Sequence, residues 1–264
     1  MTPFPALAHT IAARVAQVPG VVAVSLGGSH ARGNARPDSD LDLGLAYDAA
    51  YPFDLSALNA LCRALDDSGI ATASPPGGWG PWVDGGAWLT VGGQRVDFIY
   101  RELGRVERSV EDALAGRVTL HAQPGHPHGI HGHHYAAELG SGVILHDPAR
   151  RLERLRVRLG GYPNALAEAL DKHYGWQPGF WLDGAAKGLK RGDMHYAQGC
   201  LSQAVMAMAQ TLCARGRAWI LNETGAVSLA GALPGAPQGF EARVNAALTA
   251  LDVAAVRQLA AEVG

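Results

Sequence analysis

The feature that most constrains the fold is a change of hydrophobic pattern along the chain. Up to about residue 104, short runs rich in β-branched residues, such as Val21–Leu26, alternate with helical patterns. From Pro148 onward, apolar residues recur almost throughout at the three- and four-residue spacing of a helix. The pattern therefore predicts an α+β fold, in which a small mixed sheet with helices is followed by an all-α helical bundle domain.

The first part contains helical patterns and strand patterns in alternation. The expected helices are 6–18 and 55–65, and the expected strands are 21–26, 41–47, 87–91 and 94–100. Gly92-Gly93 separates the last two strands, and a Gly-Gly pair favours the tight turn of a β-hairpin.

The second part is predicted to be helical apart from one loop. The loop is expected at 121–134, which is rich in His, Gly and Pro. Asp193 is expected to cap the N-terminus of the helix 194–215. The domain boundary is placed near residue 115, which gives domains of 1–115 and 116–264. The expected helices are 106–114, 148–159, 163–173, 179–190, 194–215 and 240–263.

Composition narrows the class of protein. Hydrophobic residues make up 48% of the 264 residues and charged residues 17%, which excludes a chain that is mainly disordered. The 22 Lys and Arg nearly balance the 24 Asp and Glu, which excludes a globally basic nucleic-acid coat and leaves a local basic patch open. No apolar run approaches the roughly 20 residues of a membrane helix, and residues 1–18 show no signal-peptide pattern. The three cysteines form no CxxC pair and are expected to be reduced thiols, as in a cytoplasmic protein.

A glycine turn follows the first strand. Gly27, Gly28 and Ser29 come directly after 21–26. Glycines leave room for a phosphate, and a short helix that starts near Ser29 directs backbone N–H groups towards it. The Ser29 hydroxyl and the Arg32 guanidinium are further candidate donors, although Arg32 also suits a solvated turn.

Two carboxylates share one face of the next strand. Asp40 and Asp42 are two residues apart, so they lie on the same side of the strand, while Leu41 and Leu43 turn into the core. Neighbouring carboxylates repel each other unless a cation or a proton lies between them. Mg²⁺, which prefers oxygen ligands and substrate phosphates, suits this position. The alternative is an ordinary polar turn.

Asp97 is the third candidate carboxylate. It lies in the apolar strand 94–100, where an unpaired buried charge is costly. We expect it to lie beside the other two carboxylates, because three carboxylates suit two-metal phosphoryl chemistry. The alternative is an ion pair with Arg95 or Arg101.

This set of residues resembles the DNA polymerase β-like nucleotidyltransferase superfamily. Gly28-Ser29, then Asp40-Leu41-Asp42, and later a lone Asp97 on a strand are similar to its GS, DxD and third-acid pattern over residues 20–101. A small α/β part followed by helices is also similar to bacterial antibiotic nucleotidyltransferases, which act on aminoglycosides and lincosamides.

The resemblance implies a nucleotidyltransferase that uses Mg²⁺, with two ions. Gly28 and Ser29 would hold a nucleoside triphosphate, ATP or another, and Asp40, Asp42 and Asp97 would bind the ions. Asp97 would also serve as the general base or lie next to it. The enzyme would transfer a nucleoside monophosphate, AMP in the case of ATP, to a hydroxyl of a small molecule such as an antibiotic and release pyrophosphate.

The helical domain is expected to cover the carboxylates, exclude water and supply acceptor specificity. The resemblance implies that a basic residue of this domain reaches the triphosphate, and Lys187 is the candidate. The alternative for Lys187 is an interaction with the dipole at the end of its helix. Acidic residues are scattered in this half of the chain, which weakens the case for an aminoglycoside.

Two alternative functions stay open. The first is transfer to a macromolecule, a protein or a tRNA, for which Arg150–Arg158 is the densest basic stretch. The second is a non-catalytic module for nucleotide binding or association. The presence of all three candidate carboxylates argues against that module.

The loop at 121–134 is expected to be solvated or to face a substrate. A zinc site is the alternative, although the spacing lacks an accompanying Cys pair or an HExxH helix. The histidines concerned are His121, His126, His128, His131, His133 and His134. Trp79 and Trp82, in the loop before the hairpin, are expected to pack in the core, and the alternative is that they stack on a substrate.

Overall fold

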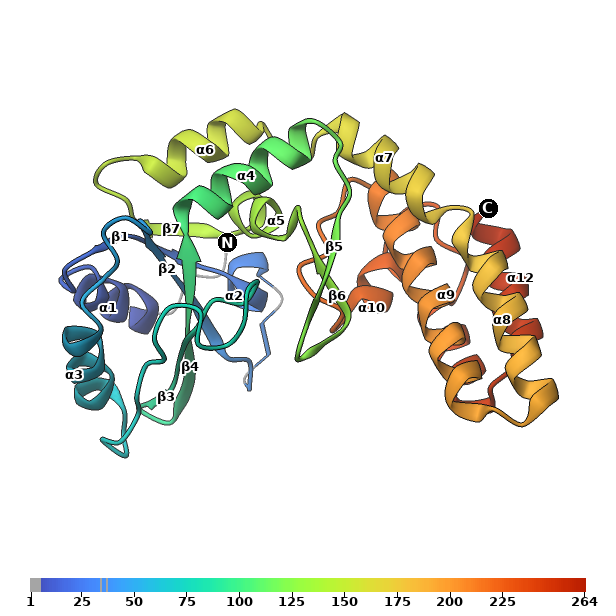
Figure 1. The fold of residues 1–264 in the computed structure, drawn as a ribbon, viewed down its shortest axis with the longest axis horizontal. Helices are drawn as coiled ribbons and strands as arrows, with labels where there is room; N and C mark the ends of the chain where they lie inside the picture. The colour runs from blue at the N-terminus through green and yellow to red at the C-terminus, as the bar shows by residue number, and fades with distance from the viewer. Residues whose placement is uncertain (1–5, 34, 37) are drawn as a thin grey trace. The chain divides into compact units, whose positions relative to one another are not determined.

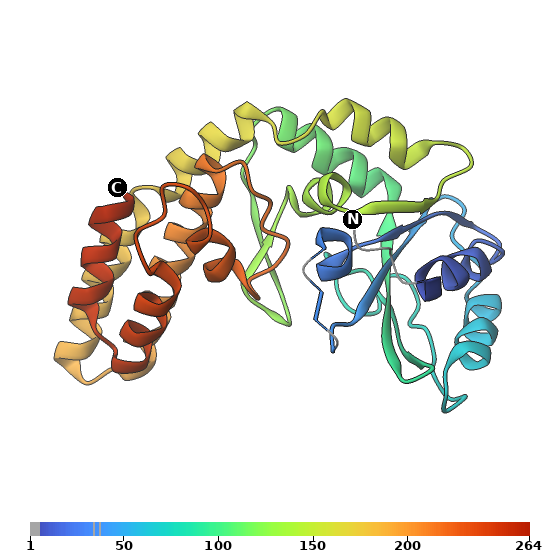
Figure 2. The ribbon, with the colours of Figure 1, turned by 180° about the vertical axis from the view of Figure 1, so that it is seen from behind.

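The computed structural model describes residues 6–33, 35–36 and 38–264 (Figures 1 and 2). The chain forms two compact units, one from Met1–Glu111 with His133–Gly161 and the other from Asp112–Gly132 with Tyr162–Gly264. The units therefore cross the boundary that we expected near residue 115. The reason is that a strand beyond residue 140 returns to the sheet of the first unit.

The first unit is built on a mixed sheet. Within the described residues its strands are β1 (Val21–Leu26), β2 (Leu41–Tyr47), β3 (Gly86–Val91), β4 (Gln94–Glu102) and β7 (Val143–His146), in the order β3-β4-β2-β1-β7. β2 and β4 run parallel, whereas the other neighbours are antiparallel. The predicted α+β class with a mixed sheet is confirmed, and β7 is an addition to the predicted strands.

Helices α1 (Ala6–Val15) and α3 (Leu55–Leu65) belong to the core on one face of this sheet. Alternate residues of the central strands, such as Leu43 and Phe98, fill this core and are fully buried. Successive side chains of a strand point to opposite faces. The neighbouring residues Asp42 and Asp97 therefore lie on the other face, away from α1 and α3.

The β3–β4 hairpin has the predicted Gly-Gly turn. Val91 pairs with Gln94, and Gly92 and Gly93 have φ angles of +59° and +77°. Side chains other than that of glycine are disfavoured at these angles. The Asp67 carboxylate accepts hydrogen bonds from both glycine N–H groups at 2.8 Å, which ties the turn to the segment after α3.

Further helices complete the first unit. They are α2 (Gly28–Arg32), α4 (Leu103–Leu114), which begins in this unit, α5 (His134–Ser141) and α6 (Arg151–Leu159). α5 packs on α4, and the Ser109 hydroxyl accepts a hydrogen bond from the Ala136 N–H at 3.0 Å. The sequence pattern does not indicate α5 and β7, because both are short and their packing partners are distant in sequence.

The second unit combines a β-hairpin with helices. Strands β5 (Leu120–Gln123) and β6 (His126–His131) pair antiparallel, so the prediction of a loop over 121–134 is wrong for most of its length. The strands escaped prediction because His, Gly and Pro give a weak strand signal. The helices of this unit are α7 (Asn164–Tyr174), α8 (Gln177–Arg191), α9 (Met194–Arg215), α10 (Ala226–Gly231), α11 (Phe240–Ala250) and α12 (Val253–Val263).

Helix α9 is the centre of this unit. Its side chains from Ala204 to Ala214 are all buried, and α7, α8, α10 and α12 contact it. Its ends lie where the sequence predicts them. The Asp193 carboxylate accepts a hydrogen bond from the Tyr196 N–H at 3.1 Å, which confirms the predicted N-cap.

The helix that we predicted over 240–263 is two helices. Leu251 adopts a left-handed φ of +52° and ends α11, and the Asp252 carboxylate then accepts a hydrogen bond from the Ala255 N–H at 3.0 Å and caps α12. Across the described part of the chain, no helix is long and apolar enough to cross a membrane.

Candidate functional site

The register of the sheet brings two of the three candidate carboxylates together. Asp42 of β2 lies directly beside Asp97 of β4 in the parallel pair. Side chains at such paired positions point to the same face of the sheet. Asp40 precedes β2 by one residue and adds a third carboxylate at this end of the strand.

The glycine turn lies against Asp42. The Gly27 N–H donates a hydrogen bond to the Asp42 carbonyl at 2.9 Å. Gly28 has a left-handed φ of +60°, and a Cβ atom there would lie 1.8 Å from Asp42 Oδ2. Only glycine fits this position, so the sequence Gly27-Gly28-Ser29 allows the turn and the carboxylates to form a single site.

The electrostatics of the site disfavour negative charge on Asp42 and Asp97. Burial, together with the charges of Glu138 and Asp40, raises the pKa of Asp42 to about 6, against a partial opposing effect of Arg101. Burial and the neighbouring Asp42 and Asp40 carboxylates likewise raise the pKa of Asp97 to about 6. A bound cation relieves such repulsion, and carboxylate oxygens are the donors that Mg²⁺ prefers.

Asp40 is held by an arginine. Arg95 Nε lies 2.6 Å from Asp40 Oδ1, and the Arg95 side chain is 65% exposed, so the pair contributes little to stability. Arg95 therefore pairs with Asp40, and Arg101 pairs with Glu138, so neither makes the ion pair with Asp97 that was the alternative interpretation. In the described part of the chain no three Asp, Glu, His or Cys side chains are grouped to hold a metal ion, so the three-carboxylate metal site stays a prediction.

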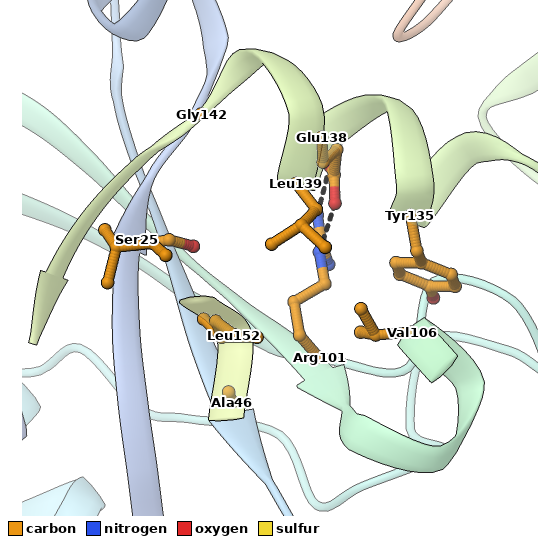
Figure 3. A pocket seen from close by; sticks show the side chains of 10 residues that line it. Ser25, Ala46, Arg101, Val106, Tyr135, Glu138, Leu139, Gly142 and Leu152 are labelled. Carbon is orange, nitrogen blue, oxygen red and sulfur yellow. Dashed lines mark hydrogen bonds and ion pairs between the residues drawn. The ribbon is translucent and has the colours of Figure 1, made fainter. Parts of the chain in front are cut away.

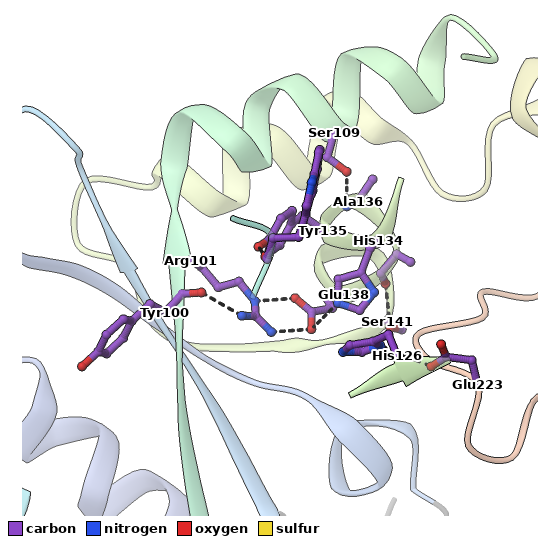
Figure 4. A network of polar contacts seen from close by, with 12 residues as sticks. Tyr100, Arg101, Ser109, His126, His134, Tyr135, Ala136, Glu138, Ser141 and Glu223 are labelled. Atoms are coloured by element: carbon purple, nitrogen blue, oxygen red, sulfur yellow. Dashed lines mark hydrogen bonds and ion pairs between the residues drawn. The ribbon is translucent and has the colours of Figure 1, made fainter. Parts of the chain in front are cut away.

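An ion pair that the sequence did not reveal lies on the same face of the sheet. Arg101 is four residues beyond Asp97 on β4, and its Nε and Nη2 lie 2.5 Å from the two oxygens of Glu138 on α5 (Figure 4). His134 Nε2 lies 3.3 Å from Glu138 Oε1, and the Arg101 guanidinium lies 5.2 Å from the centre of the Tyr135 ring.

Glu138 is charged in this network. Burial alone would raise the pKa of Glu138, but Arg101 and His134 hold it well below its usual range. The carboxylate therefore adds a fixed negative charge near Asp42. The spacing of His134 and Glu138 indicates one helix face, but the partner Arg101 is 37 residues away and the pair is formed only by folding.

A small cavity adjoins this ion pair (Figure 3). Ser25, Ala46, Arg101, Tyr135 and Glu138 are among the residues around it, and its volume is about 30 Å³. This is the volume of about one water molecule. The cavity is therefore too small for a nucleotide or its acceptor.

A larger pocket opens beside the carboxylates. It has a volume of about 460 Å³, and Asp40, Asp97 and Arg95 line it together with Trp88 of β3. Trp79 stacks on Trp88 with ring centres 4.3 Å apart, so the expectation that Trp79 packs in the core is not met.

The remaining candidate residues take no part in a contact that defines their role. Ser29 lies in the first turn of α2 and is half-buried. Arg32 is exposed, and its Nε donates a hydrogen bond to the Gly28 carbonyl at 3.3 Å. Lys187 is an exposed residue of α8 in the second unit. The phosphate-binding roles of Ser29, Arg32 and Lys187 stay predictions.

Three histidines of the predicted loop join the hairpin to other parts of the second unit, namely the loop before α10 and the helices α9 and α7. His126 Nδ1 lies 3.2 Å from Glu223 Oε2, and His128 Nε2 lies 3.1 Å from the Ser202 hydroxyl. His131 Nε2 lies 2.5 Å from the Tyr174 hydroxyl. These contacts are structural, and the described histidines form no metal-binding group.

The part of the chain that carries the glycine turn, Asp40 and Asp42 is similar to a known protein family. Residues 10–70 match the family model of the nucleotidyltransferase domain. This segment is therefore similar to a nucleotidyltransferase domain. The match includes Gly28, Ser29, Asp40 and Asp42 and ends before Asp97. The predicted enzyme class, a nucleotidyltransferase, is thereby confirmed, whereas the resemblance to the antibiotic enzymes stays a prediction.

Over the whole chain, the similarity to a solved structure is weak. A solved structure of a nucleotidyltransferase-like protein from Exiguobacterium sibiricum 255-15 is similar over 96% of this chain and 72% of that one, with 12% sequence identity and a TM-score of 0.38. A likeness at this level does not establish a common fold. None of the curated protein sequences matches the chain.

Proposed function

We propose that the protein transfers a nucleoside monophosphate, AMP from ATP, to a hydroxyl of a small molecule and releases pyrophosphate in an Mg²⁺-dependent reaction. The observation that carries the proposal is the position of Asp42, between the glycine turn on one side and Asp97 on the other. Within a nucleotidyltransferase domain, a turn that suits phosphate next to paired carboxylates supports nucleotidyl transfer.

Each residue has a role in this proposal. The backbone of Gly28 and the hydroxyl of Ser29 bind the triphosphate. Asp40, Asp42 and Asp97 would hold two Mg²⁺ ions, which would neutralise the charge of the triphosphate and of the leaving group. To bind Mg²⁺, Asp40 would give up its ion pair with Arg95. This loss would cost little stability, because the pair is exposed.

The reaction is an in-line displacement at the α-phosphorus. The acceptor hydroxyl oxygen forms a bond to the α-phosphorus, and the bond between that phosphorus and the α,β-bridging oxygen breaks. Pyrophosphate leaves with the electron pair of the broken bond, and Asp97 accepts the hydroxyl proton.

The structure gives less support to a nucleic-acid acceptor. The densest basic stretch forms α6, and three of its arginines are paired with carboxylates. Arg151 contacts Asp48 at 3.3 Å, Arg156 contacts Glu153, and Arg158 contacts Glu111 at 3.3 Å. These ion pairs neutralise charge that binding to tRNA phosphates requires.

Nucleotide binding followed by turnover tests the proposed function. Melting of the full chain is measured with ATP, GTP, CTP and UTP, each with and without Mg²⁺. We expect ATP to raise the melting temperature only when Mg²⁺ is present, because the metal ion joins the phosphates to the carboxylates. Pyrophosphate release with aminoglycosides, lincosamides and tRNA then separates the acceptor classes. Absence of a shift with every triphosphate contradicts the proposal, and a shift without pyrophosphate release for any acceptor favours the non-catalytic module.

A further inference from the structure

The pocket beside the carboxylates lies entirely within the first unit. It combines residues of the edge strand β3 with the segment after α3, and its volume is about 460 Å³. Sites for small molecules commonly have volumes of about 300–1,000 Å³. Besides Asp40, Asp97 and Arg95, the residues that line it include Trp88, Thr90, Asp66, Ser68 and Ile70.

Trp88 presents an aromatic surface to this pocket. It lies directly opposite Asp97 in the antiparallel β3–β4 pair, so both side chains are on the same face of the sheet. Trp79 stacks against it at 4.3 Å and an interplanar angle of 12°, yet Trp88 stays 66% exposed. The stack fixes the orientation of an indole that remains available to a ligand.

The order of the strands arranges these groups in a row. The glycine turn contacts Asp42 on β2, Asp42 lies beside Asp97 on β4, and Asp97 lies beside Trp88 on β3. In phosphoryl transfer the attacking and the leaving oxygen are roughly in line. If the triphosphate binds at the glycine turn, pyrophosphate leaves on that side and the attacking hydroxyl approaches from the side of Trp88.

We propose, on the basis of the proposed function, that this pocket binds the acceptor through a flat-faced ring that stacks on Trp88 and directs a hydroxyl towards Asp97. An aromatic face suits the face of a phenol or of a sugar ring, and Ser68 and Thr90 provide polar groups for further hydroxyls. The acceptor class is therefore a small hydroxylated ring compound, and Trp88 determines specificity for it.

Binding of ring compounds to the full chain tests this proposal. The probes are 4-methylphenol and methyl glucoside, with the open-chain polyol sorbitol as a comparison. Calorimetric titrations are performed with Mg²⁺ and a non-hydrolysable ATP analogue present. We expect at least one ring compound to bind and sorbitol not to bind, and the ring compound that binds identifies the acceptor as phenolic or sugar-like.

Variants locate the binding at Trp88. Trp88→Ala is expected to weaken binding of the ring compound about tenfold or more, whereas Trp88→Phe keeps most of the affinity because it keeps an aromatic face. Trp176→Ala is the matched control, since Trp176 is 65% exposed but belongs to the second unit. It is expected to bind like the wild type, and all variants are expected to bind the ATP analogue equally.

The possible failures are distinguishable. If the wild type does not bind the ATP analogue, the proposed function fails and this proposal fails with it. If the analogue binds but neither ring compound does, or if Trp88→Ala binds the ring compound like the wild type, only the acceptor pocket is overturned. If Trp88→Ala weakens the analogue instead, the pocket holds the nucleobase and the assignment to the acceptor is wrong.

Discussion

At the scale of single residues, the site depends on the absence of a side chain at Gly28. The Asp42 carboxylate occupies the space that a Cβ atom of residue 28 would need. One contact therefore requires both a glycine at position 28 and an aspartate at position 42. The glycine turn and the pair of aspartates are separate motifs in the sequence, but they pack against each other in the fold.

The substitution Gly28→Ala tests this contact. Gly33→Ala is its matched control, because Gly33 also has a left-handed φ, +72°, but no atom lies within 4 Å of the position that a Cβ atom would take there. Both substitutions introduce backbone strain of about 1–2 kcal/mol. Only Gly28→Ala also displaces Asp42, so we expect it alone to abolish binding of ATP with Mg²⁺ in calorimetry. Equal binding by the two variants contradicts the proposed role of the turn.

The charge of Asp42 is expected to lower stability when no metal is bound. In the folded chain the pKa of Asp42 is raised from 3.8 to about 6, so the folded state binds more protons than the unfolded state between these values. The free energy of unfolding therefore falls as the pH rises through this range and stays lower above it. If Asp42 binds Mg²⁺ as proposed, we expect the ion to restore the lost stability, because it offsets the carboxylate charge.

We expect the substitution Asp42→Asn to remove this penalty and, if the proposed function holds, to abolish nucleotidyl transfer. At pH 7.5 in a chelator, we expect the variant to melt above the wild type, by a gain on the order of 1–2 kcal/mol in the free energy of unfolding. Near pH 3.5 the two should melt alike, and Mg²⁺ should stabilise the wild type only. Asp183→Asn, at an exposed ion pair of the second unit, is the control and should show no such pH dependence. Turnover at the wild-type rate by Asp42→Asn removes this residue from the catalytic site.

At the scale of elements, the Arg101–Glu138 pair joins strand β4, which carries Asp97, to helix α5. Both oxygens of Glu138 are used by Arg101, and His134 adds a contact from the same helix. Removing one partner of such a pair strongly lowers stability, because the other charge is then left unpaired in a poorly solvated position.

A double-mutant cycle measures this cost. Arg101→Met and Glu138→Leu should each lower the free energy of unfolding in urea by about 2–4 kcal/mol. The double variant should lose clearly less than the sum, because neither charge is then left unpaired. Strictly additive losses contradict a direct coupling between β4 and α5.

An element can be predicted from the sequence when the residues that favour it lie within the element itself. The strands β1 and β2 and the β3–β4 hairpin carry their apolar alternation and turn glycines locally, and all were predicted to within two residues of their observed ends. β7 has four residues and β5 has four, and each becomes a strand only by pairing with a neighbour. Local pattern carries no information about such a neighbour.

At the scale of the whole molecule, the first unit is completed by a segment from beyond the predicted boundary. A fragment of residues 1–115 lacks β7 and α5, so it leaves β1 as an open edge and Arg101 without Glu138. A fragment of residues 1–161 includes both. We expect only the longer fragment to melt cooperatively and to bind ATP with Mg²⁺, as followed by circular dichroism and calorimetry. Cooperative folding of the shorter fragment shows that the returning segment is dispensable.

The sequence by itself determined the candidate site residues and the local elements that present them. Glycine geometry predicts the Gly27-Gly28-Ser29 turn. The two-residue period of a strand predicts the face on which Asp40, Asp42 and Asp97 lie. The tertiary structure alone decided that Asp42 and Asp97 are in register, that Glu138 pairs with Arg101, and that Trp88 lies beside the carboxylates. The physical reason is that strand order, register and ion pairing depend on contacts between distant parts of the chain, which no local pattern of residues encodes.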